Sequence, residues 1–178
     1  MSRYPELAAK VDAFFARVQA RHGDQMKCGS GCSHCCHVRL TVTGVEAKAL
    51  HAEISGWDPT RKAALAANAA ASPPDRCAAL DPDGHCLVYA GRPLVCRSHG
   101  APIKIRNFKA PRATKKPPKL QVFSTCRENF VGDEPDVDPD CVYDQETVST
   151  MLIAVDRAAG GDGSRIDLAD VLAAATER

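Results

Sequence analysis

A run of four cysteines within nine residues constrains the fold of this chain more than any other feature. The run reads Cys28-Gly-Ser-Gly-Cys32-Ser-His-Cys35-Cys36. Glycine lets a loop turn back on itself at little steric cost, so such a loop can direct several sulfurs at one point. An isolated cysteine is often a plain buried apolar residue, but four so close together favour a shared inorganic ligand. Zinc and iron-sulfur clusters are both commonly held by four such ligands.

Cys35 and Cys36 are adjacent, and adjacent side chains on an extended backbone face opposite sides. One of them can then serve one site while the other faces a second site, a polynuclear centre or the apolar core. The chain has nine cysteines, of which eight would fill two four-thiolate sites and Cys141 would be the spare. We expect these eight as metal ligands: Cys28, Cys32, Cys35, Cys36, Cys77, Cys86, Cys96 and Cys126.

Disulfides are the alternative to metal, and they persist in oxidising compartments. Residues 1–7 lead into an amphipathic pattern and lack the apolar stretch of a secretion signal. No segment approaches the roughly 18 apolar residues of a membrane span. We therefore expect a cytoplasmic protein without a membrane partner, whose cysteines are reduced and bind zinc or an iron-sulfur cluster.

Several helices are predicted around the cysteines. Between residues 4 and 21, apolar side chains recur at three- and four-residue steps, which is typical of a helix with one buried stripe. Thr43 and Glu46 have the spacing of a capping box, and Asp58 before Pro59 favours another helix start. The predicted helices cover residues 4–21, 43–55, 58–71, 143–159 and 167–175.

Strand signals are few. Residues 81–84 read as a tight turn and 87–89 as a short strand, which together would form a small hairpin or knuckle. Residues 103–105 and 120–123 could pair, with a basic, proline-containing loop at their tip.

The predicted fold class is mainly α with a small β-hairpin, an irregular α+β arrangement. We expect a single compact, metal-stapled domain with cysteine-rich loops between helices. It would span residues 1–160, with its core at about 28–130, and residues 161–178 would add a short C-terminal helical appendage.

Charge gives little indication of a macromolecular partner. The net charge of +1 provides no global reason to expect a nucleic acid. A local basic arm covers residues 104–119 but lacks aromatic residues apart from Phe108, so base stacking has little support. Residues 133–144 are acidic and could neutralise this arm. A nucleic acid remains a weaker alternative, and a protein partner is left open.

The second cysteine block runs from Cys77 to Arg97 and contains Cys86 and Cys96. Taken with the first run, it resembles the YkgJ-like cysteine-cluster family, which has the opening motif C-x-x-C-x-x-C-C and is described as zinc- or iron-chelating. This chain has one extra residue between the first two cysteines of the motif. Cys126 matches the later single cysteine of the family. The resemblance covers about residues 28–130 and implies a bound metal, without a general reaction.

Two further sets of residues could assist the cysteines. Arg92 and Arg97 could donate hydrogen bonds to thiolate sulfurs or form surface salt bridges. Four histidines beside cysteines could replace a ligand, although a hydrogen-bonding or surface role is favoured for each: His34, His37, His85 and His99.

Three functions follow as alternatives. The first is a metal-binding protein in which the ion is structural or chelated. The second is an iron-sulfur redox protein, electron carrier or enzyme subunit. The third is a zinc-stabilised module that binds nucleic acid or protein. No nucleophile motif or phosphate-binding loop occurs in a supporting context, so catalytic residues are not assigned.

Overall fold

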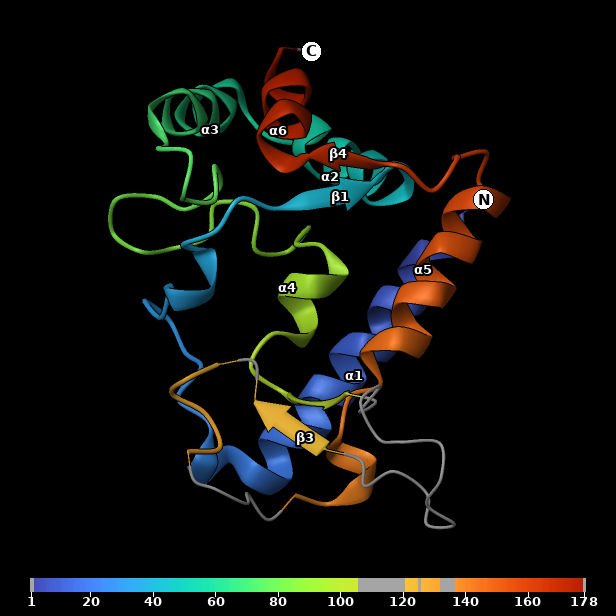
Figure 1. Cartoon of the computed structure of the whole chain (residues 1–178). Helices are drawn as coiled ribbons and strands as arrows, with labels where there is room; N and C mark the ends of the chain where they lie inside the picture. The colour runs from blue at the N-terminus through green and yellow to red at the C-terminus, as the bar shows by residue number, and fades with distance from the viewer. Residues whose placement is uncertain (1, 106–120, 125, 132–136, 178) are drawn as a thin grey trace.

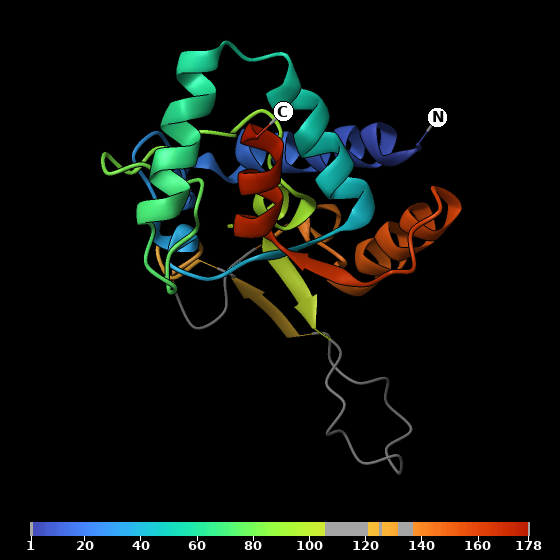
Figure 2. The same cartoon turned by 90° about the horizontal axis from the view of Figure 1, so that it is seen from above.

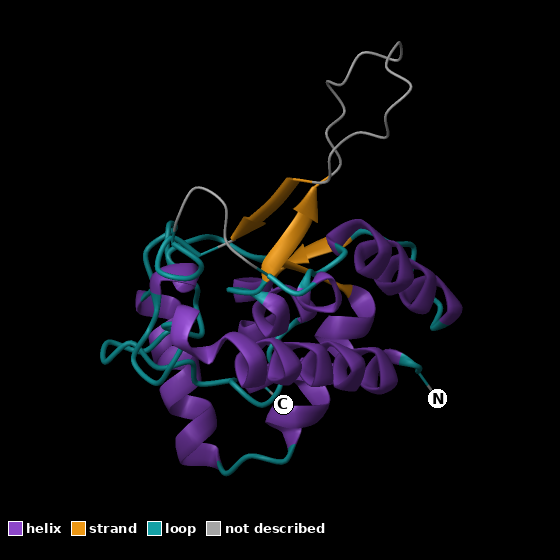
Figure 3. Cartoon of the chain, turned by 90° about the horizontal axis from the view of Figure 1, so that it is seen from below, coloured by secondary structure: helices purple, strands orange, loops and turns teal. Residues whose placement is uncertain are grey.

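The computed structural model describes residues 2–105, 121–124, 126–131 and 137–177. Most of the regular structure is helical, with two small sheets, so the predicted fold class is confirmed (Figure 3). The helices are α1 (Tyr4–His22), α2 (Gly44–Ser55), α3 (Pro59–Ala71), α4 (Leu94–Ser98), α5 (Gln145–Ala158) and α6 (Leu168–Thr176). The strands are β1 (Thr41–Thr43), β2 (Pro102–Ile105), β3 (Gln121–Ser124) and β4 (Arg165–Asp167) (Figure 1). Single 3₁₀ turns form η1 (Gly23–Gln25), η2 (His34–Cys36) and η3 (Pro139–Cys141).

Local signals account for the starts of the early helices. The capping box at α2 is formed, and the backbone N–H of Thr43 donates to Oε2 of Glu46 over 2.9 Å. At α3, the Asp58 carboxylate accepts a hydrogen bond from the backbone N–H of Arg61 over 3.0 Å. Each cap satisfies a donor that the first helical turn leaves free. The predicted starts of these two helices are therefore confirmed.

Each sheet is a pair of antiparallel strands. β2 pairs with β3, with Ile103 opposite Phe123, as predicted. Residues 106–120, which include Leu120 and most of the basic arm, lie outside the described residues. The other sheet pairs β1 with β4 and was not predicted, because its strands are three residues each and far apart in the sequence.

The predicted strand at residues 87–89 is wrong. The bridge between Leu80 and Cys86 closes the turn at residues 81–84, and turns follow Cys86. The Leu87 N–H donates to the Ala79 carbonyl over 2.8 Å. The next amide, of Val88, donates to the Cys86 sulfur. The backbone amides of Leu87 and Val88 therefore bond within residues 79–88 and do not pair with a neighbouring strand.

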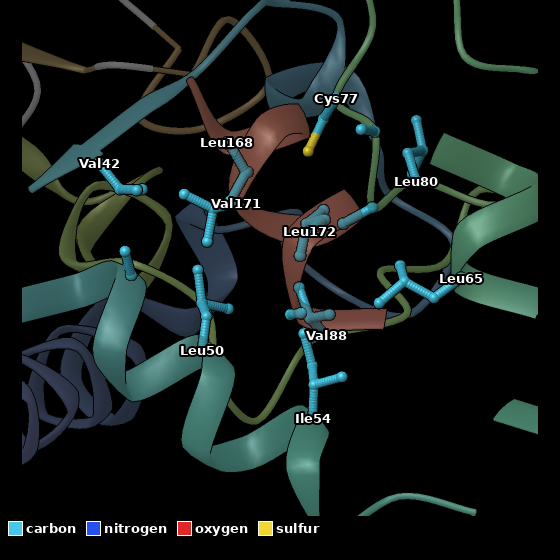
Figure 4. Packing of buried hydrophobic residues seen from close by; sticks show 14 residues of the cluster. Val42, Leu50, Ile54, Leu65, Cys77, Leu80, Val88, Leu168, Val171 and Leu172 are labelled. Carbon is cyan, nitrogen blue, oxygen red and sulfur yellow. The ribbon is translucent and has the colours of Figure 1, made fainter. Parts of the chain in front are cut away.

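The largest buried cluster joins α2, α3 and α6. Leu50, Ile54, Leu65 and Leu172 are fully buried within it (Figure 4). Figure 2 shows α6 lying between α2 and α3. Residues 165–176, within the segment predicted as a C-terminal appendage, form β4 and α6, and α6 contributes to this cluster.

A second cluster joins α1, α4 and α5, and a third lies at the end of α1. α1 and α5 run side by side (Figure 1). The third cluster contains Val18, Phe130 and Cys141. The cysteine-bearing segments connect these clusters, so their positions depend on the packing of all three.

Buried carboxylates tie the helices together. Glu46 is 2% exposed, and its Oε1 accepts the backbone N–H of Leu94 over 3.0 Å at the start of α4. Asp156 of α5 is 1% exposed and accepts the N–H groups of Val45 (2.7 Å) and Gly163 (3.0 Å). Because an unpaired buried donor is costly, Glu46 fixes α4, which carries Cys96, relative to α2. Asp156 ties α5 to the start of α2.

Candidate metal centre

The first cysteine run forms two tight turns between α1 and β1. Gly31 has a positive φ of 81°, which glycine adopts readily, and the Cys32 N–H donates to the Gly29 carbonyl over 3.1 Å. Cys35 and Cys36 then lie in the 3₁₀ turn η2, where the Cys36 N–H donates to the Ser33 carbonyl over 2.8 Å. The run therefore folds on its own backbone hydrogen bonds.

Cys35 and Cys36 do not diverge as an extended backbone would require. Their sulfurs are 3.9 Å apart, because the backbone is a 3₁₀ turn. Two thiolates on one tetrahedral zinc ion are about 3.8 Å apart, given Zn–S bonds of about 2.3 Å. The hydrogen bond with Cys36 lowers the pKa of Cys35 to about 7, and the same bond raises the pKa of Cys36.

The second block is attached directly to the first run. The Cys77 N–H donates to the Cys36 carbonyl over 2.7 Å. Burial raises the pKa of Cys77, whereas hydrogen bonds from the backbone N–H groups of Ala79 and Leu80 lower it. Burial likewise raises the pKa of Cys86, and the Val88 N–H lowers it. Backbone amides directed at a sulfur favour its thiolate form.

Cys96 lies in the short helix α4 and joins the same neighbourhood. Burial raises its pKa to about 12, and the thiolates of Cys77, Cys86 and Cys35 add to the rise. The positive charge of Arg92 acts in the opposite direction on Cys96 and on Cys86. Cys35 and Cys96, 61 positions apart in the sequence, thus come within electrostatic range of one another.

Cys28 belongs to a second neighbourhood. Burial raises its pKa, a hydrogen bond from the Asn129 side chain lowers it, and the thiolates of Cys126, Cys32 and Cys35 raise it again. Cys35 therefore interacts with both groups of sulfurs. All eight predicted ligands are linked through these interactions, whereas Cys141 lies in the third hydrophobic cluster.

The cysteine sulfurs lie in two groups, but they are not as closely packed as the ligands of one bound metal ion. In the part of the chain that the structure describes, no three cysteine sulfurs lie within 4.8 Å of one another. The donor set nevertheless suits a thiophilic metal, because reduced thiols, amide donors to sulfur and a nearby guanidinium all stabilise thiolate ligands.

Asn129 is a site residue that the sequence analysis missed. It is 1% exposed, and its side-chain oxygen accepts the Lys27 N–H over 2.8 Å. Its amide nitrogen donates to the Cys28 sulfur (3.1 Å) and to the Gly100 carbonyl (2.9 Å). The asparagine therefore joins three segments of the centre. Only its position three residues after Cys126 could have drawn attention to it.

Gly100 is a second missed residue. It has a φ of 94°, and a Cβ placed there would lie 2.7 Å from the Cys28 sulfur and 2.8 Å from Nδ2 of Asn129. Both features require glycine. Its position after His99 gave no signal, because the close approach involves residues distant in the sequence.

Arg92 and Arg97 form ion pairs rather than direct bonds to sulfur. Nη1 of Arg97 lies 2.6 Å from Oδ2 of Asp12, and Nη2 of Arg92 lies 3.7 Å from Oδ1 of the same residue. Arg92 also stacks over the Tyr89 ring, with 4.0 Å between Cζ and the ring centroid. The salt-bridge alternative fits these contacts, and Arg92 still acts on the thiols through its charge.

Of the histidines next to cysteines, His34 and His85 each contact another side chain, and His99 is partly buried. Nδ1 of His34 lies 3.0 Å from Nη2 of Arg127, and Nδ1 of His85 lies 3.8 Å from Oδ2 of Asp81. Burial lowers the pKa of His99. Among the described residues, none of these histidines, nor His37, lies in a compact set of three metal-ligand atoms.

Comparison with known proteins gives a family and no individual relative. No helix among the described residues is long and apolar enough to cross a membrane. No curated protein and no solved structure matches the chain. A family model described as "CxxCxxCC: Putative zinc- or iron-chelating domain" matches residues 27–128. Because that match covers more than half of the chain and includes all eight predicted ligands, the chain belongs to the CxxCxxCC family.

Proposed function

We propose that this protein binds metal through a cysteine cluster, as zinc or as an iron-sulfur cluster, in a structural or chelating role. The ligands come from these eight cysteines: Cys28, Cys32, Cys35, Cys36, Cys77, Cys86, Cys96 and Cys126. Membership of a chelating family supports metal binding in general. The ligand set and the role are our inference from the surroundings of the sulfurs.

The amide donors around Cys77 and Cys86 carry the proposal. Burial alone would keep these thiols protonated, and it raises the pKa of both. Backbone N–H groups from residues two or three positions further on nevertheless donate to each sulfur. A hydrogen bond of this kind stabilises the thiolate that binds a metal. An apolar buried cysteine has no need of such donors.

Burial supports a centre that metal can reach from solvent. Cys77 and Cys126 are buried, whereas the other proposed ligands are partly exposed: Cys28, Cys32, Cys35, Cys36, Cys86 and Cys96. Metal would reach the partly exposed sulfurs and be held against the buried ones. Thiolate ligands must stay reduced, so a cytoplasmic location is part of this proposal.

A structural contribution follows from the packing. Cys77 belongs to the largest hydrophobic cluster (Figure 4). Cys36 and Cys86 pack against this cluster. A metal bound to these residues would link the first run, the knuckle and the core. In such sites, metal-binding free energy contributes to folding.

Metal and sulfide analysis of protein purified without oxygen identifies the centre. Zinc in a colourless protein would support the structural or chelating form. Iron with inorganic sulfide and visible absorbance would support a cluster, and with it the redox alternative. Protein that contains neither metal, or whose cysteines are paired in disulfides, would contradict the proposal.

Substitution tests the ligand assignment. We expect Cys86→Ser and Cys32→Ser each to lower the metal content and the melting temperature together. Ala90→Ser is the matched control, because Ala90 is exposed in the same block. Full metal content and an unchanged melting temperature in Cys86→Ser would show that Cys86 is not a ligand.

A further inference from the structure

A separate set of metal-ligating side chains lies where the end of α1 meets η3. A ring nitrogen of His22, a carboxylate oxygen of Asp138 and the Cys141 sulfur all lie within 4.8 Å of one another. Among the described residues, this is the one set of three potential ligands that meets that limit. None of the three is among the eight cysteines of the candidate centre.

The spacing is close to that of a bound ion. Nε2 of His22 and Oδ2 of Asp138 are 3.5 Å apart. Nitrogen and oxygen ligands on a tetrahedral zinc ion are about 3.4 Å apart, given bonds of about 2.0–2.1 Å. Nε2 also accepts the backbone N–H of Asp138 over a long 3.4 Å. A metal ion would take the Nε2 lone pair in place of this long hydrogen bond.

Packing holds two of the three ligands in place. Cys141 is fully buried beside Val18 and Phe130. The His22 side chain is 12% exposed, and its ring meets the edge of Phe130 at 5.9 Å between centroids. Asp138 is 51% exposed. The site therefore has a rigid apolar inner wall and a ligand on the solvent side.

The surrounding charges suit a divalent cation. Asp138 and an ionised Cys141 would supply two negative charges, and neutral His22 adds none. Arg21 pairs with Asp140 at 2.8 Å, closer than its 3.4 Å contact with Asp138. Arg21 can therefore remain paired with Asp140 when a cation takes Asp138.

We propose that His22, Asp138 and Cys141 form a second metal site, which takes Zn²⁺ or a related divalent ion such as Co²⁺. Imidazole, carboxylate and thiolate are the three ligand types that zinc uses in proteins. Three protein ligands leave a fourth position for water or an exchangeable ligand. The site is independent of the cysteine cluster and would hold its ion whether or not the cluster assignment is right.

Equilibrium dialysis of the full chain against buffered zinc, followed by metal counting, tests the site. We expect His22→Gln and Asp138→Asn each to bind one zinc fewer per chain than the unmodified protein. His51→Gln and Asp24→Asn are the matched controls. His51 lies on α2, and Asp24 is an exposed acid of η1 that lies outside the ligand set. Both controls should keep the full count.

Equal zinc counts in all four variants would overturn the proposal. Cys141→Ser should also lose one ion, but it alters a fully buried position and could unfold the chain. Asp138 is half exposed, so its substitution tests binding without that complication. Circular dichroism of each variant separates loss of the ion from loss of the fold. Cys86→Ser should retain this ion, which distinguishes failure of this site from failure of the cluster.

Discussion

The side-chain amide of Asn129 donates a hydrogen bond to the sulfur of Cys28 over 3.1 Å, across 101 residues of sequence. The same side chain bonds the backbone of Lys27 and Gly100. One buried side chain thus joins the first cysteine run to the segment after α4. This connection makes Asn129 as important for the geometry of the centre as the cysteine that it contacts.

Asn129→Ala should destabilise the protein by about 1–3 kcal/mol, the cost of leaving buried polar groups unpaired. The Lys27 amide and the Gly100 carbonyl would each lose a partner. Urea unfolding measures the change. Gln19→Ala, which removes an exposed amide on α1, should change stability by less than about 0.5 kcal/mol. Equal stability of the two variants would contradict a structural role for Asn129.

Gly100→Ala should be destabilised by about 1–3 kcal/mol, because its positive φ is strained for alanine and the new Cβ would contact the Cys28 sulfur. It should also bind metal more weakly, since Cys28 must move. Gly29→Ala is the control: a Cβ there meets no atom within 4 Å. Thermal unfolding and a chelator competition assay compare the two. A Gly100→Ala protein that matches Gly29→Ala would refute the close approach.

Glu46→Ala should lower the free energy of unfolding by about 1–3 kcal/mol for each buried donor left without an acceptor. Those donors are the backbone amides of Thr43 and Leu94. Glu46→Gln retains one acceptor oxygen and should lose less. Glu6→Ala, at a side chain 66% exposed, serves as the surface control. If Glu46→Ala and Glu6→Ala had the same free energy of unfolding in urea, Glu46 would not fix α4.

The stability of the metal-free chain should fall as the pH rises above the thiol range. The raised pKa of Cys96, about 12, means that folding favours its protonated form. This contribution is fully present below the unfolded pKa of about 8.5 and is lost as the pH rises toward about 12. The affinity for metal should change in the opposite direction and increase as the pH rises, because metal binding requires thiolates.

Urea unfolding of chelator-treated and metal-loaded protein across this pH range measures both effects. The metal-free protein should lose stability with rising pH, while the affinity for metal increases. Cys96→Ala should reduce the pH dependence of the metal-free form. A metal-free protein that becomes more stable with rising pH would contradict the burial of protonated Cys96.

The sequence by itself determined the features that depend on near neighbours. The period of apolar residues located α1, and the caps at Thr43 and Asp58 gave the starts of α2 and α3. β2 and β3 were also predicted as a pair. The spacing of the cysteines was enough to indicate a family of metal-chelating domains. These signals are local because a helix start or a ligand loop is formed by residues within a few positions of one another.

Only the tertiary structure decided the rest. The pairing of β1 with β4 and the insertion of α6 between α2 and α3 join residues 41–71 to residues 165–176. The contact of Asn129 with Cys28 and the grouping of His22 with Cys141 likewise depend on contacts across long stretches of sequence. Such contacts form only when buried surfaces pack together, and a side chain has no local periodicity that records which distant partner it will meet.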